Sequence, residues 1–269
     1  MEEKKALTPL QEFNRTLMNP ATQEYIKGVL AEKKQTFMNN IVALVSLNRD
    51  LQRCKPMTVV YAALKATALG LPFEPSLGQA WVIPYNSKDG VVAQFQMGAR
   101  GYVQLALRTG KFQRINTIAV KEGELVNYDI LTGDLEIKAV PNRESKPTIG
   151  YAAYFKAGDY EKALFMYKSE MEAHAKRYSK SYSSGPWSTN FDEMAEKTVL
   201  ARLLKKWAPM AADNSQLQEA IRYDQSVIEE PDGEPIYVDG YTAEEQNVNA
   251  VNDRKAGMKK TGVTPDNLL

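Results

Sequence analysis

The stretch QAWVIPYNSKDGVVAQFQM, residues 79–97, places two short apolar segments on either side of a polar loop. Both segments are rich in β-branched and aromatic residues, which favour strands, and the loop ends in Asp89-Gly90, a pair typical of hairpin turns. We therefore predict an antiparallel hairpin with a five-residue connection at this position. The segments on either side of the hairpin determine the class of fold.

The sequence before this hairpin carries helix signals. Thr8-Pro9-Leu10-Gln11 is a capping box with proline at the first helical position, and Asn19-Pro20 repeats the cap and the proline. Two further segments have apolar residues at helical spacing, and Gly70 supplies a C-cap for the last of them. We predict a helical N-terminal part over about residues 8–70.

After the hairpin, strand signals and helix signals come in separate blocks. A short helix near 100–108 leads into strands, and the strands lie near 113–120, 125–130, 135–140, 149–156 and 161–167. Helices return near 169–179 and 191–207. A doubly wound parallel sheet would alternate strand and helix throughout, so this order favours an α+β fold. We predict N-terminal helices and a central antiparallel sheet of hairpins with packed helices, in an α+β core over about 71–210, all within one domain over 1–224.

The net charge of +1 hides an uneven distribution along the chain. Residues 100–210 contain 18 lysines and arginines against 13 acidic residues, whereas residues 225–269 contain 4 against 9. The second segment is also polar and interrupted by proline and glycine, a composition that does not bury a core. We predict a basic body suited to a nucleic-acid partner and a disordered, mobile acidic tail from Gln225 onward.

Several classes of protein are disfavoured by what the sequence lacks. No apolar stretch approaches the roughly 18 residues of a membrane span, and the first residues are not a signal peptide, so we expect a cytoplasmic protein without membrane contact. Cys54 and His174 are the single cysteine and histidine, which argues against a disulfide and a zinc site. His174 lies in a polar helical segment and is expected at the surface rather than in a catalytic triad. A phosphate-binding glycine loop is also missing, so we predict no nucleotide, metal or other cofactor.

One short pattern supports an enzymatic alternative. Asp134, followed by Glu136 and Lys138 on a predicted strand, could hold a divalent metal beside a scissile phosphate, as in a metal-dependent DNA nuclease. Simple alternation explains the same residues, with Leu135 and Ile137 facing inward and the charged residues facing water. We favour alternation because short acidic patterns often arise by chance, and we keep the nuclease as the alternative.

Basic and aromatic residues are interleaved in three segments, a mixture that suits a phosphate backbone and stacked bases. In the helix near 191–207, the basic residues fall on an arc separate from the apolar residues, at about 100° per residue. A solvated helix face would explain each segment alone, but the three together favour nucleic acid. The predicted DNA contacts, in which the tyrosines stack on bases, are Arg100, Tyr102, Arg108, Lys111, Arg177, Lys180, Tyr182, Arg202, Lys205 and Lys206.

Three longer segments carry a resemblance to a known family. They are TVVYAALKATALGLPFEPSLGQAWVIPY (58–85), MGARGYVQLALRTGKF (97–112) and GPWSTNFDEMAEKTVLARLLKKWAP (185–209). Together they resemble the RecT family of phage single-strand annealing proteins, in consistent order over roughly residues 25–210. The proline-bearing helix exit, the G-x-R-G helix and the G-P-W turn carry the resemblance.

The resemblance implies a function without an active site. It implies binding of single-stranded DNA and annealing of complementary strands without ATP, through a duplex intermediate held by a ring or helical filament of identical subunits. It also implies a separate phage exonuclease as a partner in recombination inside a bacterial host cell. There the strands are coated by the host's single-strand binding protein, which we expect the acidic tail to contact.

Overall fold

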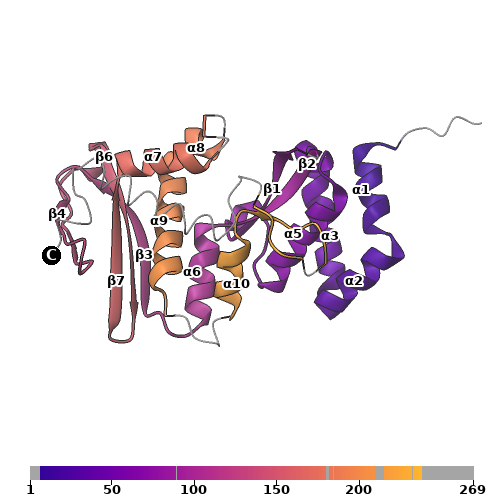
Figure 1. The fold of residues 1–269 in the computed structure, drawn as a ribbon, viewed down its shortest axis with the longest axis horizontal. Coiled ribbons are helices and arrows are strands. Elements are labelled where there is room, and N and C mark those ends of the chain that lie inside the picture. Colours follow the sequence, from indigo (N-terminus) through magenta and orange to yellow (C-terminus); the bar gives the residue numbers. More distant parts are fainter. Residues whose placement is uncertain are drawn as a thin grey trace, which may run out of the picture.

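The chain begins with five helices, shown in indigo to purple in Figure 1. The computed structural model describes residues 7–237 except 89, 180, 181, 184, 210–214 and 232. The five helices are α1 (Pro9–Leu17), α2 (Pro20–Leu30), α3 (Lys34–Leu47), α4 (Arg49–Gln52) and α5 (Pro56–Ala68). They form the helical N-terminal part that the sequence predicts.

Local capping interactions set the starts of the first two helices. Thr8 Oγ1 accepts from the backbone N–H of Gln11 at 3.3 Å, and Gln11 Oε1 accepts from the N–H of Thr8 at 2.9 Å. Asn19 Oδ1 accepts from the N–H of Ala21 at 2.9 Å. Both predicted N-caps are confirmed, and they satisfy backbone donors that have no partner within the first helical turn.

Sheet A, the first antiparallel sheet, packs against α5. Its order is β1-β2-β8, and its strands are β1 (Ala80–Ser87), β2 (Gly90–Met97) and β8 (Ser226–Val227). The predicted hairpin is confirmed, but pairing continues to Ser87 and Gly90, so its connection has two residues and not five. Thr58 Oγ1 of α5 accepts from the N–H of Ala93 at 2.9 Å and ties the helix to β2.

Sheet B, the second antiparallel sheet, lies in the other half of the molecule (Figure 1). Its order is β3-β6-β7, and a two-stranded hairpin, β4-β5, lies beside it. The strands are β3 (Arg114–Lys121), β4 (Leu125–Tyr128), β5 (Leu135–Ile137), β6 (Thr148–Ala157) and β7 (Tyr160–Tyr167). The remaining helices are α6 (Ala99–Arg108), α7 (Lys168–Tyr178), α8 (Pro186–Thr189), α9 (Phe191–Trp207) and α10 (Ser215–Tyr223). The predicted α+β class is confirmed.

The two faces of sheet B are covered by different elements. α9 packs across one face, where Ala153 and Phe155 of β6 belong to the main core. Ala152 and Phe165 form a smaller cluster with the apolar residues of the β4-β5 hairpin. Because side chains alternate along a strand, the hairpin covers the face opposite to α9.

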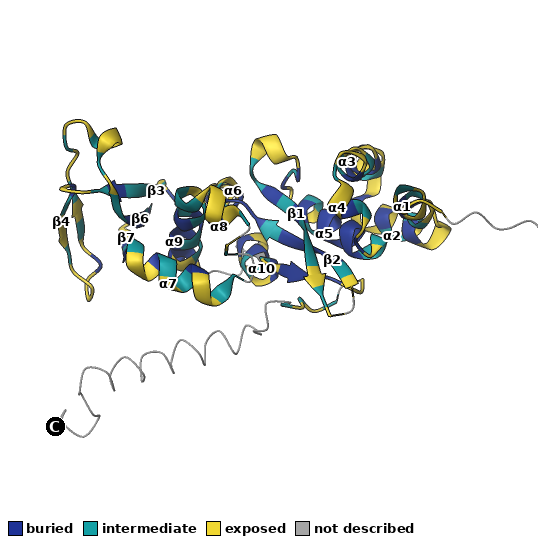
Figure 2. Cartoon of the chain, turned by 90° about the horizontal axis from the view of Figure 1, so that it is seen from above, coloured by how far each residue is buried: buried dark blue, intermediate teal, exposed yellow. Residues whose placement is uncertain are grey.

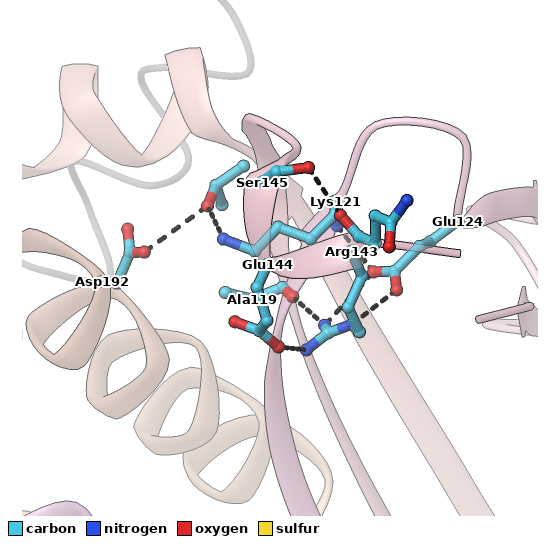
Figure 3. A network of polar contacts seen from close by, with 9 residues as sticks. Ala119, Lys121, Glu124, Arg143, Glu144, Ser145 and Asp192 are labelled. Atoms are coloured by element: carbon cyan, nitrogen blue, oxygen red, sulfur yellow. Dashed lines mark hydrogen bonds and ion pairs between the residues drawn. The ribbon is translucent and has the colours of Figure 1, made fainter. Parts of the chain in front are cut away.

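A polar network fixes the base of the β4-β5 hairpin to sheet B (Figure 3). The buried carboxylate of Glu124 accepts from Nε of Arg143 at 2.7 Å and from the N–H of Lys121 at 2.8 Å. The Arg143 guanidinium also donates to the carbonyl of Ala119 on β3 at 3.1 Å. The hydrogen bond from Arg143 is the main cause that lowers the pKa of Glu124. The hairpin is therefore anchored by a charged pair in which the carboxylate is buried and the guanidinium is partly exposed.

The carboxylate of Asp224 joins the two halves of the molecule. Asp224 follows α10, and its Oδ1 accepts from the N–H of Met97, at the end of β2, at 2.7 Å. Its Oδ2 accepts from the hydroxyl of Tyr102 on α6 at 2.7 Å. Nζ of the buried Lys197 on α9 lies 3.7 Å from Oδ1. One side chain thus connects sheet A with the helices that cover sheet B.

The predicted start of the tail at Gln225 is wrong. The N–H of Gln225 donates to the carbonyl of Phe95 at 2.9 Å, and residues 226–227 pair with β2 as strand β8. Ser226, Val227 and Ile228 are buried. This segment is folded because the edge of β2 offers backbone partners and an apolar surface. Ile236 also bridges to Val227, and of the predicted tail only residue 232 and residues 238–269 lie outside the described residues.

Across the described ranges, no helix combines the length and the apolar character that crossing a membrane requires.

Candidate nucleic-acid interface

α9 presents the two arcs that the sequence predicts. The leucines of its apolar arc are buried in the core, whereas Arg202, Lys205 and Lys206 are exposed. Trp207 packs against the core with part of its ring, and Nζ of Lys206 lies 4.4 Å from the ring centre. The basic arc therefore rests on a helix whose orientation is fixed by the core.

α7 adds an arginine to this basic arc. Met171 and Ala175 lie on the buried side of α7. His174, Arg177 and Tyr178 lie in the last turns of the same helix. Nη1 of Arg202 lies 3.3 Å from Nδ1 of His174. The structure thus places Arg202 of α9 next to an imidazole on α7, three positions before Arg177, although the two arginines are 25 positions apart in the sequence.

His174 is not the solvated surface residue that the sequence predicts. It is partly buried, and burial is the main cause that lowers its pKa to about 4, with further contributions from Arg202 and Arg177. The ring is therefore neutral at physiological pH. A neutral imidazole allows two arginines to lie close together without adding a third positive charge.

An aromatic ring lies within the same cluster. The rings of His174 and Tyr178 are 4.6 Å apart, and the Arg177 guanidinium lies 5.4 Å from the centre of the Tyr178 ring. Loss of hydration lowers the pKa of Lys205, an effect that Asp224 opposes and Arg202 adds to. We call the surface formed by Arg177, Tyr178, Arg202, Lys205 and Lys206 the α7–α9 surface.

Two of the predicted DNA contacts have structural roles instead. Tyr102 is 2% exposed, and its hydroxyl donates to Asp224, so it cannot stack on a base. Burial, followed by the charge of Asp224, raises its pKa well above the ordinary value. The Arg108 guanidinium donates to the carbonyls of Leu69 and Gly70 at 2.9 and 2.8 Å, where it caps the end of α5. Tyr102 is therefore not part of the candidate site, whereas Arg108 is still exposed at the surface.

The remaining predicted contacts lie outside the α7–α9 surface. Arg100 is exposed in the first turn of α6, and Lys111 is half-buried just after the helix ends, so both flank α6. Tyr182 packs partly against the core, with Nζ of Lys176 at 5.7 Å from its ring centre. Lys180 lies outside the described residues.

The acidic pattern of the nuclease alternative forms part of a strand surface. Glu136 and Lys138 are exposed and form an ion pair with each other at 2.9 Å. Asp134 accepts from the hydroxyl of Thr132 at 2.9 Å. Among the residues that the structure describes, no group of three or more histidine, cysteine, aspartate or glutamate side chains is arranged to hold a metal ion.

The list of predicted DNA contacts left out Tyr178, a member of the α7–α9 surface, and His174, whose ring lies beside it. Their spacing of four positions places them on one helix face, which was the available signal. The position of Arg202 against them depends on how α7 and α9 pack on sheet B, and no local pattern encodes that packing.

The protein is of the α+β class, and exposed cations with an aromatic ring on two helices are features expected of a nucleic-acid interface. Comparison with known proteins gives the family. The family model described as RecT family matches residues 35–237. The chain belongs to the RecT family, whose members are recombination proteins that interact with single-stranded DNA.

Two relatives illustrate this membership. The chain is 37% identical over 226 residues to the uncharacterized protein YqaK of Bacillus subtilis (strain 168), a match that covers 82% of this chain and 76% of YqaK. It is 30% identical over 195 residues to Protein RecT of Escherichia coli (strain K12), covering 70% of this chain and 68% of that protein.

Proposed function

We propose that this chain binds single-stranded DNA through the α7–α9 surface and anneals complementary strands without a nucleotide cofactor. The observation that supports this proposal is the meeting of Arg177 and Arg202 beside the His174–Tyr178 ring pair. Two arginines on separate helices can hold successive phosphates, and Tyr178 can stack on a base. Phosphate contacts carry no base information and leave the base edges free to pair.

Assembly is part of the proposed mechanism. One weak, sequence-independent site does not align a long strand, whereas many identical sites in a row do so cooperatively. We propose a ring or helical filament that acts in phage recombination inside a bacterial host cell. A separate phage exonuclease supplies single strands, and the residues after 237 contact the host's single-strand binding protein.

Replacing both arginines of the cluster should weaken DNA binding without changing its sequence preference. For the double variant Arg177→Ala, Arg202→Ala, we expect a roughly 10- to 30-fold loss of affinity for single strands, from two contacts of about 1 kcal/mol each. The slope of log affinity against log salt should become shallower by about 1.4, because two phosphate contacts are lost. Fluorescence anisotropy with labelled oligonucleotides measures the affinity and its dependence on salt. A nucleotide-free annealing assay then measures the activity of the same variant.

The matched control removes two exposed cations from the other half of the molecule, as Arg15→Ala with Lys27→Ala. This control should bind and anneal like the unmodified chain. A strict need for ATP in annealing would contradict the proposed mechanism. Shortening of the DNA in magnesium, abolished by Glu136→Ala, would instead support the nuclease alternative.

His174 offers an independent probe of where DNA binds. As the single histidine, its imidazole can be followed directly by NMR, with a midpoint at about pH 4 in the free protein. A phosphate on Arg177 and Arg202 would offset their positive charge, so the pKa of His174 should rise when single-stranded DNA binds. By linkage, DNA affinity should then increase as pH falls from neutral toward 4, since the bound state takes up the proton more readily. An unchanged titration in saturating DNA would place the strand elsewhere.

A further inference from the structure

The tip of the β4-β5 hairpin exposes two large apolar side chains. Ile130 and Leu131 are 87% and 90% exposed, although apolar side chains of this size are usually buried. They lie next to each other in the loop that connects the two strands. Two adjacent apolar side chains with this exposure make the tip a candidate contact surface for another macromolecule.

Hydrogen bonds hold this tip in one conformation. Asp129 Oδ1 accepts from the N–H groups of Leu131 and Thr132 at 2.7 and 3.0 Å. The carbonyl of Asp129 accepts from the N–H of Gly133 at 2.8 Å. The base of the hairpin is fixed by the Glu124–Arg143 pair described above. Since the loop is already ordered, docking of the tip would require little further loss of conformational entropy.

The hairpin is also strongly acidic. Residues 122–137 contain five aspartates and glutamates and no lysine or arginine. Four of the five are exposed, namely Glu122, Asp129, Asp134 and Glu136. Two lysines lie at the hairpin: Lys138 pairs with Glu136, and Nζ of Lys162 donates to the carbonyl of Thr132. The four exposed acidic residues outnumber them, so the complement of the tip is an apolar residue with arginine or lysine beside it.

Such a complement lies on the N-terminal helices. Leu47, the last residue of α3, is 89% exposed. Arg49 and Arg53 follow it in the α4 turn, and both are exposed. Residues 33–53, which we call the helical end, contain four lysines and arginines and one acidic residue, Asp50.

The hairpin and the helical end lie far apart within one molecule. Figures 1 and 2 both place β4 at one extreme of the long axis and α1, α2 and α3 at the other. The two surfaces therefore cannot meet within one chain, but they can meet between two copies of it.

We propose that the tip of the β4-β5 hairpin docks on the helical end of a second copy of this chain, so that subunits join head to tail. Ile130 and Leu131 contact Leu47, while the acidic hairpin faces Arg49 and Arg53. The inference rests on the assembly included in the proposed function and adds the surfaces that form it. Because the two surfaces differ, every growing row of subunits keeps one free tip and one free helical end. Growth then continues as a helical filament, unless the two ends meet and close a ring.

Complementary variants of the full-length chain test this interface. The tip variant is Ile130→Ser with Leu131→Ser, and the helical-end variant is Leu47→Ser with Arg49→Glu. All four side chains are exposed, so both variants should fold. Sedimentation velocity with single-stranded DNA present should show an at least tenfold weaker self-association for each variant, because central apolar anchors dominate such contacts. Leu107→Ser, at an exposed leucine on α6, is the matched control and should assemble normally.

A mixture of the two variants gives the decisive result. The tip variant keeps an intact helical end, and the helical-end variant keeps an intact tip, so an equimolar mixture should form a one-to-one dimer that does not grow. Normal assembly of either variant, or a mixture that stays monomeric although both proteins are folded, would overturn the interface. Annealing by the unmodified chain is measured in parallel. If the unmodified chain anneals and the tip variant still assembles, only the proposed interface is wrong. If the unmodified chain neither assembles nor anneals, the proposed function is wrong.

Discussion

Asp224→Ala is expected to lower the free energy of unfolding by about 3–5 kcal/mol, the usual effect of removing one partner of a buried charged pair. The substitution leaves the ammonium group of Lys197 buried without its nearby carboxylate. It also removes the acceptor for the N–H of Met97 and for the hydroxyl of Tyr102. These groups come from β2, α6 and α9, so their loss affects the junction of the two halves. Urea denaturation followed by circular dichroism measures the change.

Two further variants separate charge from hydrogen bonding. Asp224→Asn keeps an acceptor oxygen but removes the negative charge near Lys197, so it should destabilise the fold less than alanine does. Combining Asp224→Asn with Lys197→Met removes both charges and should restore part of the lost stability. A stability of Asp224→Ala within about 0.5 kcal/mol of the unmodified chain, as for an ordinary surface substitution, would show that this junction contributes little.

The elements that local signals specify were predictable from the sequence. The caps at Thr8 and Asn19 depend on residues within three positions, and both form as expected. The hairpin at 79–97 combines strand propensity with a turn pair, and α9 shows a clear division into apolar and basic arcs. In each case the signal and the structure that it specifies lie within one short segment.

The failures arise where distant segments meet. Tyr102 looked available beside Arg100 in an amphipathic helix, but Asp224, which accepts from its hydroxyl, lies 122 positions away. The capping role of Arg108 was also missed, because the carbonyls of Leu69 and Gly70 to which it donates lie 39 and 38 positions away. α10 was missed although its buried positions, Leu217 and Ala220, have helical spacing. Its neighbour β8 has two residues, too few for a periodic pattern.

The burial of the residues in and just after β8 leads to the second large effect. A chain that ends at Asp224 lacks Val227 and Ile228, which are 1% and 4% exposed. Burial of each aliphatic side chain stabilises the fold by about 1.5–3 kcal/mol, so this truncation should reduce the free energy of unfolding by about 3–6 kcal/mol. It also removes the pairing of β8 with β2 and the bridge between Val227 and Ile236. Thermal and urea denaturation of the purified truncated chain measure the loss.

A chain that ends at Tyr237 is the matched comparison, because it keeps β8 and the bridge to Ile236 while removing residues 238–269, with five of the nine acidic residues of the segment 225–269. We expect its stability to lie within about 0.5 kcal/mol of the full chain, and its annealing of bare strands to be retained. Its annealing of strands precoated with the host's single-strand binding protein should fall if the tail contacts that protein. The double variant Val227→Ala, Ile228→Ala in the full chain should reproduce much of the destabilisation without removing any residue. If ending the chain at Asp224 leaves the stability unchanged, β8 is peripheral and the tail begins at Gln225 after all.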